Sequence, residues 1–233
     1  MTQATVLLFD IDGTLIASGG AGYRAMLGAF AALHMREDIF QSGFSFAGMT
    51  DRAIIRHGLG GVPAIAIDEA AIDRLLDAYL EHLEIELERS KSFKVLPGVL
   101  ALLDAVHAIP GVAVGLGTGN VRRGAFAKLT RGALDGAFAF GGYGCDAEDR
   151  TELLRVGATR GADALGASLA DCRVVVIGDT PKDVAAAYGI GARCIGVGTG
   201  SYTAADLLAC GADVAFDTLA APGVSASLFD IVS

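Results

Sequence analysis

The sequence feature that most constrains the fold is an apolar run ending in two alternating aspartates, Val6-Leu7-Leu8-Phe9-Asp10-Ile11-Asp12-Gly13-Thr14-Leu15. The four apolar residues, with aromatic and β-branched members among them, predict a short buried strand. Because residues two apart on an extended backbone point the same way, Asp10 and Asp12 face one side beyond the strand end. Two neighbouring carboxylates repel each other and favour a bound cation, for which an all-oxygen pair suits Mg²⁺ best. Asp-Gly is also ordinary turn chemistry, so this stretch alone leaves both interpretations open.

Further apolar segments repeat the pattern of a strand, a polar turn and a helix. Strands are predicted over 112–116, 137–140, 173–177, 192–197 and 213–216. Helices are predicted between them over 99–108, 122–134, 149–159, 181–189 and 204–210. This alternation predicts an α/β fold with a doubly wound parallel sheet.

Two of these strands lead into residues suited to chemistry, Gly117-Thr118-Gly119-Asn120 and Gly178-Asp179-Thr180-Pro181-Lys182-Asp183. Small and hydroxyl residues between a strand and a helix can cradle an oxyanion with backbone N–H groups, although a glycine-rich turn with a threonine cap has the same pattern. In open α/β sheets, ligands bind beyond the carboxyl ends of the strands. We therefore expect one edge of the sheet to gather Asp10, Asp12, Thr118, Asp179 and Asp183.

The segment between about residues 17 and 93 interrupts this alternation. Apolar residues recur there at helical spacing over 21–34, 50–57 and 68–89, with Thr50 as an N-cap and no strand pattern. We therefore divide the chain into a core of residues 1–16 and 94–233 and an inserted helical domain of residues 17–93.

Composition and charge exclude several classes of protein. The net charge of −9 disfavours nucleic acid and anionic membranes as partners. No apolar run has membrane length, and the N-terminus lacks the pattern of a signal peptide. The four cysteines form no Cys-x-x-Cys pair and are interpreted as buried, reduced thiols. We expect a cytoplasmic protein with a small-molecule partner, and the sequence leaves open whether it is a monomer or a homodimer.

With these stretches in view, the chain resembles the haloacid dehalogenase superfamily, in its phosphoglycolate-phosphatase-like branch, over nearly its whole length. The first family motif matches Asp10 to Leu15, the second matches Thr118 with Gly119 and Asn120, and the fourth matches Gly178 to Asp183. The helical insert lies where the family carries its small α-helical cap. The resemblance implies a Rossmann-like core with that cap.

The chain departs from the family pattern at the third motif, which is usually a lysine, often followed by proline. Arg150 is our candidate for this basic role, because its planar guanidinium can grip two phosphate oxygens. Lys128 is set aside because it follows the second motif too closely. The alternative for Arg150 is a surface pair with Asp149 or Glu152.

The resemblance implies a phosphatase mechanism with a Mg²⁺ cofactor. Asp10 attacks the phosphorus to form an aspartyl-phosphate, and Asp12 serves as general acid and then base. The metal is held by the carboxylates of Asp10 and Asp179 and the backbone carbonyl of Asp12. Asp183 orients the metal or its water, unless it is only a first-turn helix acid.

The expected substrate contacts follow from the same resemblance. The phosphoryl oxygens contact Thr118, the N–H groups of Gly119 and Asn120, and Arg150. Arg52, at the start of an insert helix, is a candidate to meet a substrate carboxylate, although arginines there are commonly surface residues.

Three functions remain open at this stage. A phosphatase for a small phosphorylated metabolite is favoured, because Asp12 is present, whereas the dehalogenating and phosphonate-cleaving relatives lack the second aspartate. A phosphomutase uses the same two aspartates and differs in cap closure and water exclusion. A non-catalytic interaction module on the same fold is the third. Phosphoglycolate as the substrate is suggested by the resemblance alone.

Overall fold

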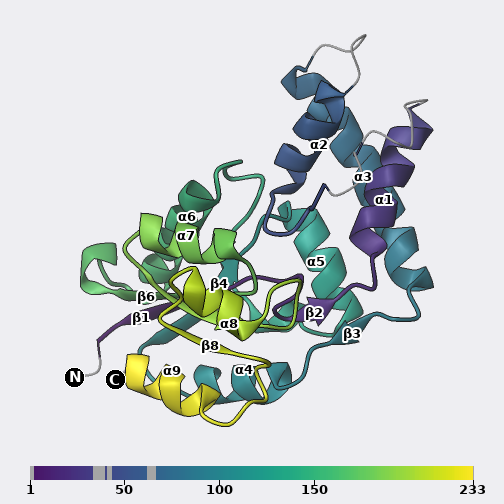
Figure 1. Ribbon diagram of the computed structural model, residues 1–233. Helices are drawn as coiled ribbons and strands as arrows, with labels where there is room; N and C mark the ends of the chain where they lie inside the picture. Colours follow the sequence, from purple (N-terminus) through teal and green to yellow (C-terminus); the bar gives the residue numbers. More distant parts are fainter. Residues whose placement is uncertain (1–2, 34–39, 41–43, 62–66, 233) are drawn as a thin grey trace.

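The computed structural model describes residues 3–33, 40, 44–61 and 67–232. It shows a six-stranded parallel sheet covered by helices on both faces, with three further helices standing beyond one end (Figure 1). The predicted fold class, a doubly wound parallel sheet with an inserted helical cap, is confirmed.

The central strand of the sheet is β1, and its neighbours are β4 and β6. The strand order is β5-β4-β1-β6-β7-β8, and every neighbouring pair is parallel. From β1 the chain builds β4 and β5 on one side and then β6, β7 and β8 on the other. Connections that leave a central strand in opposite directions open a crevice at its carboxyl end, where ligands bind. The strands are β1 (Thr5–Phe9), β4 (Val112–Gly117), β5 (Gly141–Gly142), β6 (Arg173–Gly178), β7 (Arg193–Val197) and β8 (Val214–Phe216).

Each face of the sheet has its own buried core, because successive residues of β1 point to opposite faces. Leu7 and Phe9 pack toward α4 (Val99–His107), α5 (Arg122–Arg131) and α9 (Val224–Val232). Val6 and Leu8 pack toward α6 (Arg150–Ala164), α7 (Pro181–Gly189) and α8 (Ala204–Ala209). All five residues of β1 are fully buried, so the strand that leads to Asp10 is fixed from both sides.

The three helices of the insert, α1 (Ala21–Ala32), α2 (Asp51–Gly60) and α3 (Glu69–Arg89), pack around a third core. Thr50 is the N-cap of α2, as predicted, and its side chain accepts a hydrogen bond from the N–H of Ala53 at 3.2 Å. Val121, from the loop before α5, is also buried in this core. The insert therefore packs directly on the loop that follows β4.

A short antiparallel pair of strands joins the insert to the core, and the sequence did not predict it. β2 (Ile16–Ala17) pairs with β3 (Lys94–Val95) where the chain leaves the sheet and returns to it (Figure 1). Two residues are too few to display an alternating pattern. The domain boundaries at 16/17 and 93/94 remain a prediction, and they coincide with this pair.

Other sequence predictions need correction. The strand predicted over 137–140 is wrong: Ala137 ends a short 3₁₀ helix, η1 (Asp135–Ala137), residues 138–140 are irregular, and the strand that follows is β5. A Cβ on Gly142 would collide with the backbone of α6, so this position requires glycine. The strand therefore lacks the apolar side chains by which a sequence pattern reveals a strand. A second 3₁₀ helix, η2 (Leu169–Asp171), precedes β6, and α9 was not predicted.

The cysteines are all free, but only Cys194 is buried, whereas Cys145 and Cys210 are exposed. The prediction of buried thiols is therefore confirmed for Cys194 and wrong for the two exposed residues. Among the described residues, the helices are too short or too polar to cross a bilayer.

Candidate active site

Three aspartates meet at the carboxyl ends of β1 and β6. Asp10 directly follows β1, and its N–H donates to the carbonyl of Ile177 in β6 at 2.9 Å, which holds the two strand ends together. Asp179 follows β6, and Asp183 lies in the first turn of α7. The three carboxylates are buried, and each offers an oxygen within 4.8 Å of the others.

Asp183 is held in place by the local structure of α7. Thr180 and Asp183 form a capping box: the N–H and hydroxyl of Thr180 donate to Asp183 Oδ2 at 3.0 and 2.7 Å. Pro181 occupies the first turn, as the sequence predicted. The box begins α7 immediately after Asp179 and so fixes the position of both carboxylates.

Burial and mutual repulsion make this carboxylate cluster electrostatically unfavourable by itself. Desolvation, followed by the charges of Asp10 and Asp183, raises the pKa of Asp179 to about 9. Desolvation likewise raises the pKa of Asp10 to about 6, against the opposing effect of Arg150. A hard divalent cation, which prefers oxygen ligands, would relieve this repulsion, and the residues present therefore fit such an ion.

The three carboxylates are not equally available as metal ligands. Both oxygens of Asp183 already accept hydrogen bonds, from Arg150 and from Thr180, so Asp10 and Asp179 are the better direct ligands. Gly13 lies beside them with φ of +86°, and a Cβ there would overlap the Asp179 carboxylate. Glycine at this position therefore leaves the space that Asp179 occupies.

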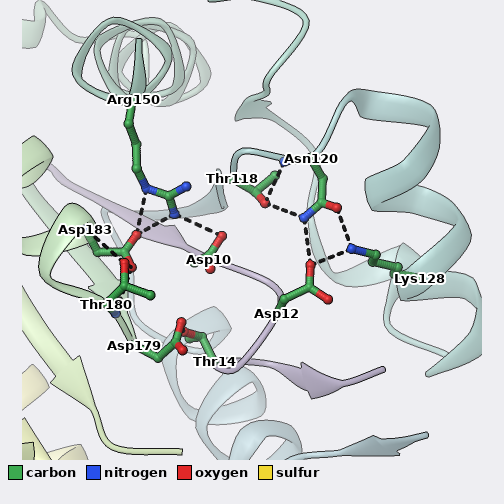
Figure 2. Close-up of polar contacts among 10 residues, drawn as sticks. All are labelled: Asp10, Asp12, Thr14, Thr118, Asn120, Lys128, Arg150, Asp179, Thr180 and Asp183. Carbon is green, nitrogen blue, oxygen red and sulfur yellow. Dashed lines mark hydrogen bonds and ion pairs between the residues drawn. The ribbon is translucent and has the colours of Figure 1, made fainter. Parts of the chain in front are cut away.

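Arg150 joins the carboxylate cluster from the start of α6 (Figure 2). Its Nε donates to Asp183 Oδ1 at 2.9 Å, its Nη2 also donates to that oxygen, and Nη2 lies 3.1 Å from Asp10 Oδ1. The side chain is 9% exposed, so the guanidinium points inward rather than toward a surface partner. The structure thus places Arg150 beside Asp10.

Lys128 reaches the site from the opposite side, which corrects the sequence analysis (Figure 2). Its Nζ donates to Asp12 Oδ2 and to Asn120 Oδ1, both at 2.6 Å. The side chain is 5% exposed, whereas that of Asp12 is 39% exposed. Lys128 was set aside because it follows the second motif closely, but long helical side chains lean toward the N-terminus of their helix and so back toward that motif.

The loop after β4 completes this side of the site. Asn120 Nδ2 donates to Asp12 Oδ2 and to Thr118 Oγ1, both at 2.9 Å. Asn120 therefore links Thr118, Asp12 and Lys128 in one hydrogen-bonded group. Gly119 and Asn120 line the cavity, whereas Thr118 is fully buried behind them.

Arg52 is the one predicted site residue that the structure does not bring to the others. Its guanidinium pairs with Glu69 at 2.5 Å and with Asp73 at 2.8 Å. It is not among the residues that line the cavity. Its expected contact with the substrate is therefore not supported.

A cavity of about 470 Å³ lies above these residues, between the sheet and the insert. Asp51, at the start of α2, accepts a hydrogen bond from the N–H of Val121 at 2.8 Å, and its own N–H donates to the carbonyl of Gly119 at 2.9 Å. These two bonds tie the insert to the loop that carries Asn120. The helices of the insert thus form the far wall of the cavity.

The fold and the site together define an α/β protein of the haloacid dehalogenase type. The family model described as haloacid dehalogenase-like hydrolase matches residues 4–191, and the chain belongs to this family of hydrolases. A search of the curated proteins finds no match.

Several solved structures have the same fold. A predicted phosphatase from Clostridium acetobutylicum aligns with a TM-score of 0.72 at 18% identity, covering 98% of this chain and 100% of that one. A predicted phosphoglycolate phosphatase from Haemophilus somnus aligns with a TM-score of 0.69 at 16% identity and covers 100% of both chains. CbbY from Rhodobacter sphaeroides in complex with phosphate gives 0.68 at 20%, covering 96% and 97%.

Proposed function

We propose that this chain is a Mg²⁺-dependent phosphatase that hydrolyses a small phosphorylated metabolite through an aspartyl-phosphate on Asp10. The observation that carries the proposal is the position of Asp10 between a buried arginine and a second aspartate that is paired with a buried lysine. Arg150 lies on one side of it, and the pair of Asp12 and Lys128 lies on the other. Two of the solved structures with the same fold are predicted phosphatases, which supports the same chemistry.

Asp10 is the nucleophile in this proposal. Its carboxylate lies at the carboxyl end of the central strand and lines the cavity. Arg150, 3.1 Å from Asp10 Oδ1, favours the ionised form of the nucleophile and can donate to the phosphoryl oxygens during transfer. A Mg²⁺ ion held by Asp10, Asp179 and the backbone of Asp12 would supply charge neutralisation for the anionic substrate.

Asp12 is the proton carrier for the leaving alcohol and later for the attacking water. Both of its donors, Lys128 and Asn120, bind Oδ2. The other oxygen, Oδ1, accepts no hydrogen bond from the described residues and can hold the proton. Fixing one oxygen orients the carboxyl group, which is what general acid–base catalysis requires.

The N–H groups of Gly119 and Asn120 are proposed to receive the phosphoryl oxygens, on a loop that the fully buried Thr118 supports. Thr118 Oγ1 accepts hydrogen bonds from the backbone and side-chain nitrogens of Asn120, which holds this loop in place. Gly119 lines the cavity directly. Such preorganised donors stabilise charge that develops in the transition state.

The test is release of inorganic phosphate from a panel of small phosphate esters, with and without Mg²⁺. Wild type is expected to release phosphate only with the metal, and Asp10→Asn to release none. Asp12→Asn should lose about 10²–10⁴-fold in kcat, because proton transfer is lost while the nucleophile remains. The control is Asp163→Asn, which changes an exposed aspartate on α6 in the same way.

Two outcomes would contradict the proposal. Activity retained by Asp10→Asn would remove Asp10 from its role. Conversion of a sugar phosphate to an isomer without release of phosphate would point to a mutase instead.

A further inference from the structure

The far wall of the cavity, which the insert supplies, holds mainly apolar and aromatic side chains, and Ser18, Ser45 and Asp51 also line it. This wall holds Tyr23 and Met26 from α1, Phe44, Phe46 and Met49 from the segment before α2, Ile54 from α2 and Tyr79 from α3. The polar groups that would bind phosphate all lie on the opposite side, at the ends of the strands. A substrate held with its phosphate at Asp10 therefore presents the rest of the molecule to an apolar surface.

Phe46 is the centre of this wall. Its ring lies 5.1 Å from that of Tyr23, 4.8 Å from that of Phe40 and 5.7 Å from that of Phe44, measured between centroids. Phe40 in turn packs edge-on against Phe30 in the core of the insert, with centroids 5.5 Å apart. The aromatic surface is thus supported from behind rather than formed by isolated side chains.

The charges around the cavity do not favour a second anionic group on the substrate. Among the described residues, the lining holds four carboxylates, Asp10, Asp12, Asp51 and Asp179, and only two cations, Lys128 and Arg150. Both cations already contact carboxylates. A divalent metal and these cations together balance the carboxylates, and the phosphate remains as the anion to be bound.

Three arginines of the insert are engaged elsewhere. Arg24 pairs with Glu86 at 2.6 Å, Arg52 pairs with Glu69 and Asp73, and Arg56 pairs with Glu148 at 3.0 Å. None of the three lines the cavity. The charged group that the insert does present there, among its described residues, is the buried carboxylate of Asp51.

We infer that the site selects phosphate monoesters of uncharged alcohols that carry an apolar or aromatic group, and disfavours esters with a second anionic group such as phosphoglycolate. This inference rests on the proposed phosphatase function. An apolar leaving group gains from burial against Phe46 and its neighbours. A carboxylate there would be desolvated beside Asp51, and Lys128, the cation near Asp51, already pairs with Asp12.

Matched esters test this inference directly. Benzyl phosphate and 4-carboxybenzyl phosphate have the same ring and differ in one remote carboxylate, and ethyl phosphate lacks the ring. We expect kcat/KM for benzyl phosphate to exceed that for ethyl phosphate, 4-carboxybenzyl phosphate and phosphoglycolate by about tenfold or more. Ethyl phosphate lacks the apolar ring that is buried against the wall, and the other two carry a carboxylate that the site repels. Turnover of 4-carboxybenzyl phosphate or phosphoglycolate as fast as benzyl phosphate would overturn the inference.

Variants assign the effect to the wall. Phe46→Ala should lower kcat/KM for benzyl phosphate about tenfold and that for ethyl phosphate by a much smaller factor, while Phe46→Leu keeps apolar bulk and most of the preference. Asp51→Asn retains an acceptor for the N–H of Val121 and should narrow the gap between the benzyl and carboxybenzyl esters. Leu100→Ala, at an exposed position of α4, is the matched control. Equal effects of Phe46→Ala on the benzyl and ethyl esters would contradict the role of the wall.

A binding measurement separates this inference from the proposed function. Calorimetric titration of Asp10→Asn protein with benzyl and 4-carboxybenzyl phosphate, in the presence of Mg²⁺, reports selection without turnover. Tighter binding of the benzyl ester without hydrolysis by wild type would support the selectivity and refute the phosphatase. Hydrolysis with equal binding of the two esters would support the phosphatase and refute the selectivity.

Discussion

At the scale of single residues, two cations hold two aspartates for different tasks. Arg150 contacts Asp10 and Asp183, whereas Lys128 contacts Asp12. Each cation thereby fixes one carboxylate of the pair that follows β1. The proposed nucleophile and the proposed proton carrier are thus oriented independently of each other.

Replacing Lys128 tests this division. In Lys128→Met the apolar stem remains, but Asp12 loses its charged donor and Asn120 loses a partner. We expect kcat to fall about 100-fold, as for removal of a preorganised donor, with KM changed much less. Lys128→Arg should recover part of the loss because it keeps the charge.

The control for this prediction is Arg123→Met on the same helix, whose side chain is 55% exposed and pairs with Glu84. It should leave the kinetics unchanged. A Lys128→Met variant with wild-type kcat would show that Asn120 alone orients Asp12.

The sequence predicted the site best where chemistry follows directly from a strand. Asp10 and Asp179 could be placed at one edge because each follows a buried strand, and parallel strands end together. Lys128 could not be placed, because its contact depends on how far a side chain reaches back along α5. The ion pairs of Arg52 depend on α3 lying beside α2, which the local pattern of α2 does not reveal.

At the scale of elements, the start of α2 connects the insert to the core. Asp51 lies there with its side chain 6% exposed, between the N–H of Val121 and the positive charge of Lys128. Burial nevertheless outweighs these partners and raises the pKa of Asp51 to about 6. A helix terminus at this junction therefore carries a carboxyl group that titrates in a mildly acidic range.

The stability of the protein should reflect this titration. Since the folded pKa is above the usual value of 3.8, the folded state binds the proton more tightly than the unfolded state. The stabilising contribution of protonated Asp51 is fully present below pH of about 4 and is lost as pH rises through about 6. A shift of about two units corresponds to about 3 kcal/mol.

Urea unfolding of wild type and Asp51→Asn at intervals from pH 4 to pH 7 measures this contribution. As pH rises, the unfolding free energy of wild type should fall relative to that of Asp51→Asn. Asp10 and Asp179 titrate in both proteins, so their effects cancel in that difference. A difference that stays constant over this range would contradict the prediction.

Elements were predictable where the sequence pattern was long enough. The helices of the insert and the strands β1, β4, β6 and β7 follow from runs of apolar residues at the expected spacing. β5 consists of two glycines, of which Gly142 packs closely against the backbone of α6, and β2 and β3 have two residues each. Their positions are set by tertiary contacts, which leave little trace in local sequence.

At the scale of the whole molecule, the carboxylate cluster couples metal binding to stability. Because Asp10, Asp179 and Asp183 are buried together, the metal-free protein either retains the repulsion among them or binds a proton at Asp179 to reduce it. Mg²⁺ at about 100 times its dissociation constant should stabilise the protein by about 2.7 kcal/mol, which a thermal melt detects as a rise in Tm.

Asp179→Asn should have two opposite effects. Without metal at neutral pH, its Tm should exceed that of wild type, because the raised pKa of Asp179 requires wild type to bind a proton on folding and the amide requires none. With metal, it should show little further rise, because a ligand is lost. Asp104→Asn, at an exposed position on α4, should melt like wild type in both conditions. A metal-dependent rise in Asp179→Asn equal to that of wild type would exclude Asp179 as a ligand.

The pairing of β2 with β3 bears on how this kind of molecule diversifies. Ile16 faces Val95 across the pair, so the chain leaves the sheet and returns to it at adjacent positions. When the two ends of an inserted segment lie next to each other, the segment does not have to bridge a distance in the core domain. Such sites tolerate large replacements. Evolution, or an engineer, can therefore exchange the 76 residues between β2 and β3 while the carboxylates at the strand ends stay in register. The core that carries the carboxylates and the insert that lines the far side of the cavity can therefore change separately within one chain.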